Sequence, residues 1–288
     1  MNLEPLTLVV LLGCLQLIFG GYVFLSLIDM KLDIPRQRRG YILTLVITYF
    51  PLTIISFYIF QLIKKIEFMT LNLLIDQSMN GIIDSLLLCV ILLSFLHFVI
   101  SWRYGNKFFF SSLRFRKLVA IMIAAIALAV IIFLFIRFDL GFIGIALITV
   151  QSILSGLLLG GSLTSMTWGH WYLVTPSLPK EPLELLTKNL LIIIFLSLIY
   201  FIFIIYFNYL IIEIDYKNYE FSLISNPALW LRFFVGLCMP LILTIFAYKA
   251  ARINGMMSAT GLLYLVLGST LAGVFLSNAL LFEIGLSL

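Results

Sequence analysis

Eight long apolar runs, separated by short polar segments, make up the pattern of hydrophobic and polar positions along the chain. A bilayer core about 30 Å thick needs roughly 20 helical residues per crossing, because hydrocarbon offers no partners to unpaired backbone amides. The pattern therefore predicts an all-α integral membrane protein, a bundle of about eight transmembrane helices in a single domain over residues 1–288. We place the helices near residues 5–28, 41–63, 81–102, 118–136, 142–168, 188–212, 227–249 and 259–282.

Composition indicates that lipid surrounds most of the protein. Of the 288 residues, 63% are hydrophobic and 11% are charged, whereas a soluble domain carries about 25% charged residues. So little charge cannot cover the surface of a water-soluble globule. The lipid bilayer is therefore the first expected partner. The net charge of +5 does not indicate nucleic-acid binding, because the cations lie in short clusters between the apolar runs.

These cations give an expected orientation. Thirteen of the 18 Lys and Arg residues lie in or beside the connections after the first, third, fifth and seventh runs, and four lie on the opposite side. Cytoplasmic loops of membrane proteins carry the excess of Lys and Arg. We therefore expect a multi-pass protein of the cell (inner) membrane, with both termini on the non-cytoplasmic side.

Two glycine pairs suggest an internal duplication. The pair Gly20–Gly21 stands 15 residues before Pro35, and the pair Gly160–Gly161 stands about as far before Pro176. The first and fifth spans run in the same direction, so a duplication would be a parallel four-plus-four repeat. The alternative is coincidence, because glycines are common in packed membrane helices.

Small residues recur at helical spacing in the fifth and eighth runs. The two stripes contain Ser152, Gly156, Gly160 and Thr164, and Ser269, Gly273 and Ser277. Small residues four positions apart let helix backbones approach closely. We therefore expect tight helix packing at Gly156, Gly160, Gly161 and Gly273.

Two ionisable side chains lie within the apolar runs. Asp84 in the third run and Arg232 in the seventh each fall about one helical turn below the outer surface. Charges inside a membrane are costly, and they mark a function or pair with one another. If the repeat is real, the two residues lie at similar depth in corresponding spans, and we expect an Asp84–Arg232 ion pair. The alternative is that each side chain reaches the lipid headgroups independently.

The chain contains two histidines, His97 and His170, and both fall toward the predicted cytoplasmic ends of their spans. Two imidazoles on different helices at one depth can ligate a haem b, with cations meeting its propionates, and an imidazole can also hydrogen-bond a quinone head group. We therefore expect a cofactor site for haem b or a quinone at His97, His170, Arg103 and Arg252. In the alternative interpretation, His170 belongs to an interfacial aromatic belt and His97 bonds a backbone carbonyl.

The sequence lacks the motifs of soluble-type catalysis. It has no P-loop, no GxSxG elbow and no dinucleotide fingerprint. It also has no cluster of His, Cys, Asp and Glu at the spacing of metal ligands. We therefore assign no catalytic residue and no metal site.

The segment Gly169–Val174 (GHWYLV), followed by Pro176 and preceded by a glycine-rich span, resembles one found in uncharacterised bacterial multi-pass membrane proteins. The likeness covers a short part of the chain and implies no activity, but it draws attention to His170. The number of spans is also similar to that of quinone-reactive anchor subunits of respiratory complexes, an analogy of size that no residue motif supports.

Three functions fit these features. The first, which we favour, is a membrane subunit of an electron-transfer or quinone-reactive assembly, working with other membrane or peripheral subunits. The second is a transporter of a small or lipid-like molecule, in which spans kinked at Pro51 and Pro240 move past the packed ones. Transporters place polar groups near mid-depth, and the few found there, Gln151, Ser152, Ser155 and Asn278, argue against an ion-coupled pump and leave an apolar or lipid-like cargo. The third is a non-catalytic scaffold or assembly subunit of a membrane complex.

Overall fold

The computed structural model describes residues 4–31, 38–64, 79–103, 113–136, 141–175, 179–215 and 226–284. They form α1 (Glu4–Lys31), α2 (Arg38–Ile63), α3 (Asn80–Arg103), α4 (Leu113–Ile136), α5 (Gly141–Val174), α6 (Glu181–Asp215), α7 (Pro227–Phe233), the π-helix η4 (Phe234–Cys238), α8 (Met239–Arg252) and α9 (Met256–Ile284). In this described part, eight helical stretches are long and apolar enough to cross a membrane, and α7, η4 and α8 together make one of them. The predicted all-α bundle of about eight spans is therefore confirmed.

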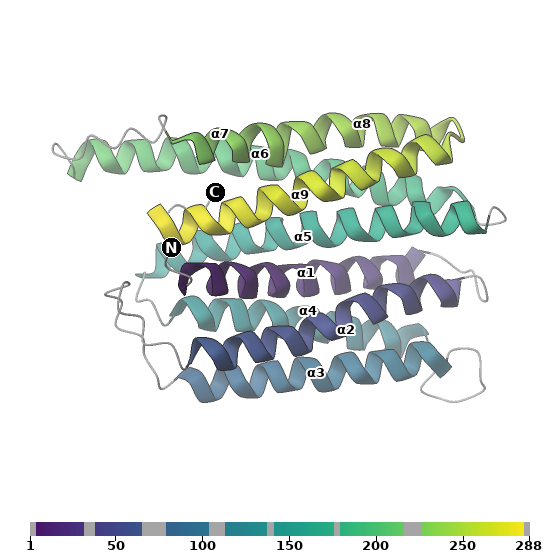
Figure 1. The fold of residues 1–288 in the computed structure, drawn as a ribbon, viewed down its shortest axis with the longest axis horizontal. Helices are drawn as coiled ribbons and strands as arrows, with labels where there is room; N and C mark the ends of the chain where they lie inside the picture. Colours follow the sequence, from purple (N-terminus) through teal and green to yellow (C-terminus); the bar gives the residue numbers. More distant parts are fainter. Residues whose placement is uncertain are drawn as a thin grey trace.

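The spans lie side by side with their axes roughly aligned, and α1 and α5 occupy the centre (Figure 1). α1 packs on α2, α4, α5 and α9, and α5 packs on α1, α4, α6 and α9. In its most apolar stretch 83% of the residues of α1 are buried, compared with 28% for α3 and for α6. α1 begins and α9 ends at the same end of the bundle (Figure 1), as an even number of crossings requires.

The first four spans and the last four repeat one set of neighbours. In the first half, α1 packs on α2 and α4, α2 packs on α3, and α3 packs on α4. In the second half, α5 packs on α6 and α9, α6 packs on α8, and α8 packs on α9. The contacts between halves correspond too, because α4 touches α5 and α9 touches α1. A parallel four-plus-four duplication predicts this arrangement, with α3 matching the span formed by α7, η4 and α8.

Glycines bring α1 and α5 together at the centre. A Cβ atom built on Gly20 would lie 1.7 Å from the carbonyl oxygen of Gly156, and one built on Gly160 would lie 2.1 Å from the carbonyl carbon of Gly20. The two backbones therefore touch, as small residues at this spacing allow. Gly161 faces a side chain instead, and its Cβ would lie 2.7 Å from Cζ of Phe24.

The seventh span is interrupted by the π-helix η4. Pro240 has no N–H to donate to the carbonyl of Gly236 four residues earlier, which α-helical pairing would require. The chain changes to π pairing just before this point, and the N–H of Met239 donates to the carbonyl of Phe234. The disturbance that Pro240 causes is therefore a widened turn near the middle of the span.

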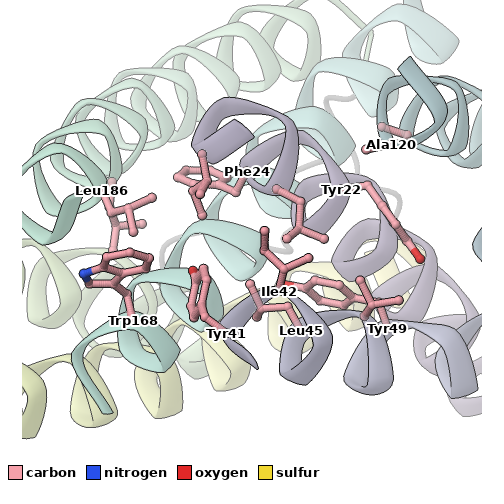
Figure 2. Packing of buried hydrophobic residues seen from close by; sticks show 14 of the residues in the cluster. Tyr22, Phe24, Tyr41, Ile42, Leu45, Tyr49, Ala120, Trp168 and Leu186 are labelled. Atoms are coloured by element: carbon pink, nitrogen blue, oxygen red, sulfur yellow. The ribbon is translucent and has the colours of Figure 1, made fainter. Parts of the chain in front are cut away.

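Large aromatic side chains fill the core toward one end of the bundle. Figure 2 shows Tyr22, Tyr41, Tyr49 and Trp168 packed among aliphatic side chains of several helices. The rings of Tyr41 and Trp168 meet edge-on with their centroids 4.7 Å apart, and the Tyr41 hydroxyl donates to the carbonyl of Thr164 at 2.9 Å. The tyrosines thus carry polar atoms into this aromatic part of the core.

Candidate functional site

A polar stripe on α3 faces the interior of the first half. Ser94, His97 and Ser101 follow one another at intervals of three and four residues, so they lie on one face of the helix. All three are at most 1% exposed. Phe95 and Trp102, in contrast, are 53% and 56% exposed. α3 therefore turns polar groups into the bundle and aromatic rings outward.

The imidazole of His97 is enclosed by protein. Its ring meets Tyr22 of α1 edge-on, with centroids 5.4 Å apart and an interplanar angle of 86°. Within the described part of the chain, neither ring nitrogen has a hydrogen-bond partner. A neutral imidazole presents one N–H donor and one acceptor nitrogen. A buried polar group without a hydrogen-bond partner raises the free energy of the folded protein. A ligand or water that supplies the missing hydrogen bonds therefore binds favourably at such a place.

Three hydroxyl groups lie in the same region. Ser94 and Ser101 flank His97 by about one turn on either side along α3, and the Tyr22 hydroxyl lies near that of Ser94. None of the three makes a hydrogen bond of normal geometry to a described residue. Tyr49 packs beside Tyr22, with ring centroids 5.7 Å apart, but its own hydroxyl meets that of Thr164 at 3.4 Å.

A buried cation adds charge to this region. Arg116 lies within the first turn of α4 and is only 1% exposed, although its sequence position suggested a loop cation. Its guanidinium is close enough to His97 for its charge to act on the imidazole. These side chains bring one positive charge and several hydroxyl groups to one buried region. We name them the His97 cluster: Tyr22, Ser94, His97, Ser101 and Arg116.

The His97 cluster lies toward the end of the bundle that carries most of the cations. His97 stands six residues before Arg103, the last residue of α3, so it lies about 9 Å from the helix end. Arg116 stands near the start of α4 at the same end. This is the end predicted to face the cytoplasm.

The structure does not bring the two histidines together. His170 on α5 is exposed, and its Nδ1 lies 3.0 Å from the hydroxyl oxygen of Tyr264 on α9. His97 contacts α1 instead, and its helix packs on α2 and α4. Ligation of one haem by both imidazoles needs ring nitrogens only about 4 Å apart, given metal–nitrogen distances of about 2 Å. The separate surroundings of the two rings do not support such a haem.

The two cations expected beside the cofactor also lie apart. The helices α3 and α8 lie on opposite edges of the bundle (Figure 1). Arg103 is the last residue of α3 and Arg252 the last of α8, and both side chains are exposed. The guanidinium carbon of Arg252 lies 5.9 Å from the ring centroid of Tyr248 in its own helix. Neither cation is part of the His97 cluster.

Asp84 has partners other than the expected Arg232. Its carboxylate accepts hydrogen bonds from Nζ of Lys64 at 2.6 Å and from Nε2 of Gln61 at 2.7 Å. Gln61 lies in the last turn of α2 and Lys64 directly follows that helix, which packs on α3, whereas Arg232 lies on α7 in the other half (Figure 1). The expected Asp84–Arg232 pair is therefore wrong, because in the described part of the chain α3 packs on α2 and α4 and not on the seventh span.

We expect the Lys64–Asp84 pair to contribute little to stability. The two side chains are 22% and 28% exposed, and pairs open to solvent contribute about 1 kcal/mol at most and weaken in salt. Asp84→Asn should therefore lower the melting midpoint of the purified protein only slightly, and by less at high salt. A large loss in Asp84→Asn that Lys64→Gln does not share would show that the carboxylate has another role.

The polar residues at mid-depth bond one another across helices. Gln16 and Asn278 exchange two hydrogen bonds, of 3.1 and 2.9 Å, between their side-chain amides. Gln151 donates from Nε2 to the hydroxyl of Ser277 at 2.9 Å. These bonds join α9 to α1 and to α5, the two central spans.

Sequence reasoning identified His97 but missed its neighbours. The spacing of Ser94, His97 and Ser101 was the available signal, because a polar stripe in an apolar helix marks the face that turns inward. Tyr22 and Arg116 gave no comparable signal. No protein-family model, curated protein or solved structure matches this sequence. The His97 cluster is therefore interpreted from its own chemistry.

Proposed function

We propose that this chain is the membrane subunit of a quinone-reactive assembly and that the His97 cluster binds the quinone head group. The observation that supports this function is the enclosed imidazole of His97, whose two nitrogens lack protein partners in the described structure. The hydroxyls of Tyr22, Ser94 and Ser101 beside it make the same place polar inside an apolar bundle.

The His97 cluster is richer in donors than in acceptors. Each hydroxyl brings one O–H, the guanidinium of Arg116 brings only N–H groups, and a neutral imidazole brings one N–H. A quinone ring presents two carbonyl oxygens and no donor, so its hydrogen-bonding needs complement the cluster. Because the ring is uncharged, its entry into a low-dielectric interior costs much less than the entry of a carboxylate or a phosphate.

The outer face of α3 suits the apolar tail of a quinone. Phe95 and Trp102 are exposed, and the rings of Phe98 and Phe50 stack with their centroids 6.4 Å apart. Phe98 also packs against Trp102, at 6.0 Å between ring centroids. In the proposed complex the tail lies along these rings while the head group reaches between the helices.

Reduction of a quinone consumes two electrons and two protons. In the proposed assembly, a partner subunit with a redox cofactor supplies the electrons. His97 and Tyr22 hold the exchangeable protons nearest the head group, and the imidazole is suited to relay them. We propose that this end of the bundle faces the cytoplasm and that both termini lie on the other side of the inner membrane, because of the bias of Lys and Arg along the sequence.

Quinone binding by matched histidine variants tests the proposed function. The probe is a short-tail benzoquinone, titrated into the purified protein in lipid nanodiscs and followed by quenching of tryptophan fluorescence. Loss of one good hydrogen bond at an enclosed site corresponds to roughly a tenfold loss of affinity. We expect His97→Ala to weaken binding at least about tenfold, His97→Gln to weaken it less, and His170→Ala to leave it unchanged.

His170→Ala is the matched control, because His170 is exposed and bonds Tyr264 outside the His97 cluster. Three results would contradict the proposed function. They are wild-type protein that binds no quinone, equal binding by the two alanine variants, and a reduced-minus-oxidised haem α-band in the purified protein.

A further inference from the structure

A second buried polar group lies in the other half of the bundle. Arg232 on α7 is 3% exposed, and its Nε and Nη1 have no hydrogen-bond partner in the described structure. Among the described residues no carboxylate forms an ion pair with it, and Asp84, its expected partner, bonds Lys64 and Gln61 instead. A guanidinium inside a membrane is costly, and such residues turn to the interior where function places them.

Two glycines make the space that the Arg232 side chain occupies. A Cβ on Gly236 of η4 would lie 2.7 Å from Cα of Gly273 on α9 and 3.0 Å from Nη1 of Arg232. A Cβ on Gly273 would likewise lie 3.0 Å from Nη1. The guanidinium therefore extends along the contact between the seventh span and α9, at the level of both glycines.

This level lies near the middle of the membrane. Gly236 stands nine residues after Pro227, where α7 begins, and nine residues of helix rise about 13 Å. Half of the hydrocarbon core is about 15 Å. The sequence placed Arg232 about one turn below the surface, but its guanidinium reaches deeper because the side chain extends toward Gly236.

Polar groups of α5 lie at the same level. Two hydrogen bonds join α5 to α9 and show which of their residues lie at the same level. One links Gln151 and Ser277 at 2.9 Å, and the other links Ser162 and Thr270 at 3.1 Å. Ser155 stands between Gln151 and Ser162 on the same face of α5, just as Gly273 stands between Thr270 and Ser277. The Ser155 hydroxyl and Oε1 of Gln151 are both buried and without a described partner.

The backbone beside this group is not a regular helix. η4 begins two residues after Arg232 and ends two residues before Pro240. Turns of π-helix are frequent at functional sites. Interrupted helices at mid-depth also form the binding sites of many membrane transporters.

From these placements we propose that Arg232, with Ser155 at the same level of α5, forms a site for an oxyanion, a carboxylate or phosphate group, at mid-depth in the second half of the bundle. The guanidinium supplies the charge and a planar set of N–H donors that suits such oxygens. The Ser155 hydroxyl supplies a further donor at the same level. This site is separate from the His97 cluster. Of the functions predicted from the sequence, it favours the transporter rather than the quinone-reactive subunit.

Anion-dependent thermal stability tests the Arg232 site. The probes are sodium phosphate, sodium benzoate and a short-chain phosphatidylglycerol, each added to detergent-purified protein at ionic strength matched with sodium chloride. A ligand that binds the folded state raises its melting midpoint, and we expect a rise of at least about 3 °C for one probe at saturation. Arg232→Gln should abolish the rise, and Arg232→Lys should retain part of it.

Arg252→Gln is the matched control, because Arg252 is an exposed cation at a helix end. The anion should raise the melting midpoint of this variant as much as that of the wild type. A rise with phosphatidylglycerol alone identifies a lipid headgroup as the source of the oxyanion, and a rise with phosphate or benzoate identifies a free anion. Absence of any rise, or equal loss in Arg252→Gln and Arg232→Gln, would overturn the site. The rise should persist in His97→Ala, so failure of the quinone proposal and failure of this one are distinguishable.

Discussion

Gly20→Ala should destabilise the protein far more than one added methyl group does at an open position. The new Cβ would lie 1.7 Å from the carbonyl oxygen of Gly156, and a backbone atom cannot move aside as a side-chain rotamer can. The two central helices must therefore separate, and their packing loosens along the contact. Overpacking of a close-packed core by such a group costs roughly 1–3 kcal/mol, and we expect the upper end. The melting midpoint of the detergent-purified protein, followed by tryptophan fluorescence, measures the loss.

Gly268→Ala is the matched control for Gly20→Ala. Gly268 also lies inside a long apolar helix, α9, but nothing stands within 4 Å of a Cβ built there. Alanine is the better helix former by roughly 0.5–1 kcal/mol, so this variant should melt at or above the wild-type temperature. Gly160→Ala, whose Cβ would lie 2.1 Å from the carbonyl carbon of Gly20, should behave like Gly20→Ala. Equal melting of Gly20→Ala and Gly268→Ala would show that the α1–α5 contact is looser than described.

Replacement of either Gln16 or Asn278 alone should lower the free energy of unfolding by more than half of the decrease caused by replacement of both. The two amides exchange hydrogen bonds of 3.1 and 2.9 Å, and both side chains are fully buried. Gln16→Leu leaves the amide of Asn278 without a partner, and a buried group in that state costs about 1–3 kcal/mol. The double variant Gln16→Leu/Asn278→Leu removes both amides, so we expect its loss of stability to be smaller than the sum of the two single losses.

A double-mutant cycle measures this coupling between α1 and α9. The four proteins are compared by melting midpoint or by unfolding in a denaturing detergent. Ser197→Ala serves as the control, because the Ser197 hydroxyl bonds the carbonyl of Ile193 in its own helix, and it should change stability little. Strict additivity of the two leucine substitutions would mean that the amides find other partners when one of them is removed.

The spans could be predicted from the sequence because hydrocarbon imposes one strong rule on every residue that enters it. Each crossing must be helical and long, so the apolar runs alone locate the helices. The close packing at Gly156 and Gly160 follows a similarly local signal, since small residues four apart mark a contact face. What the sequence does not contain is the identity of the neighbour, here Gly20 on α1.

The candidate sites were predicted less well for the same physical reason. The sequence gives the depth of Asp84 but not the span that lies beside it, so depth alone pairs it with Arg232, whereas the structure pairs it with Lys64 at the end of α2. His97 and His170 likewise share a depth but not a neighbourhood. The depth of a residue in the membrane follows from its position in its span. Which face of a helix turns inward, and which helices lie beside it, depend on packing between segments that are distant in the sequence.

The contact between α1 and α5 also determines how anything can enter the protein. Where two backbones touch at Gly20 and Gly156, no side chain stands between them that could swing away and open a channel along the centre. Small molecules must enter sideways from the lipid or from one end of the bundle. His97 belongs to the half on one side of this contact and Arg232 to the half on the other, so we expect a ligand at one site to reach the other only through the lipid or when the central helices part.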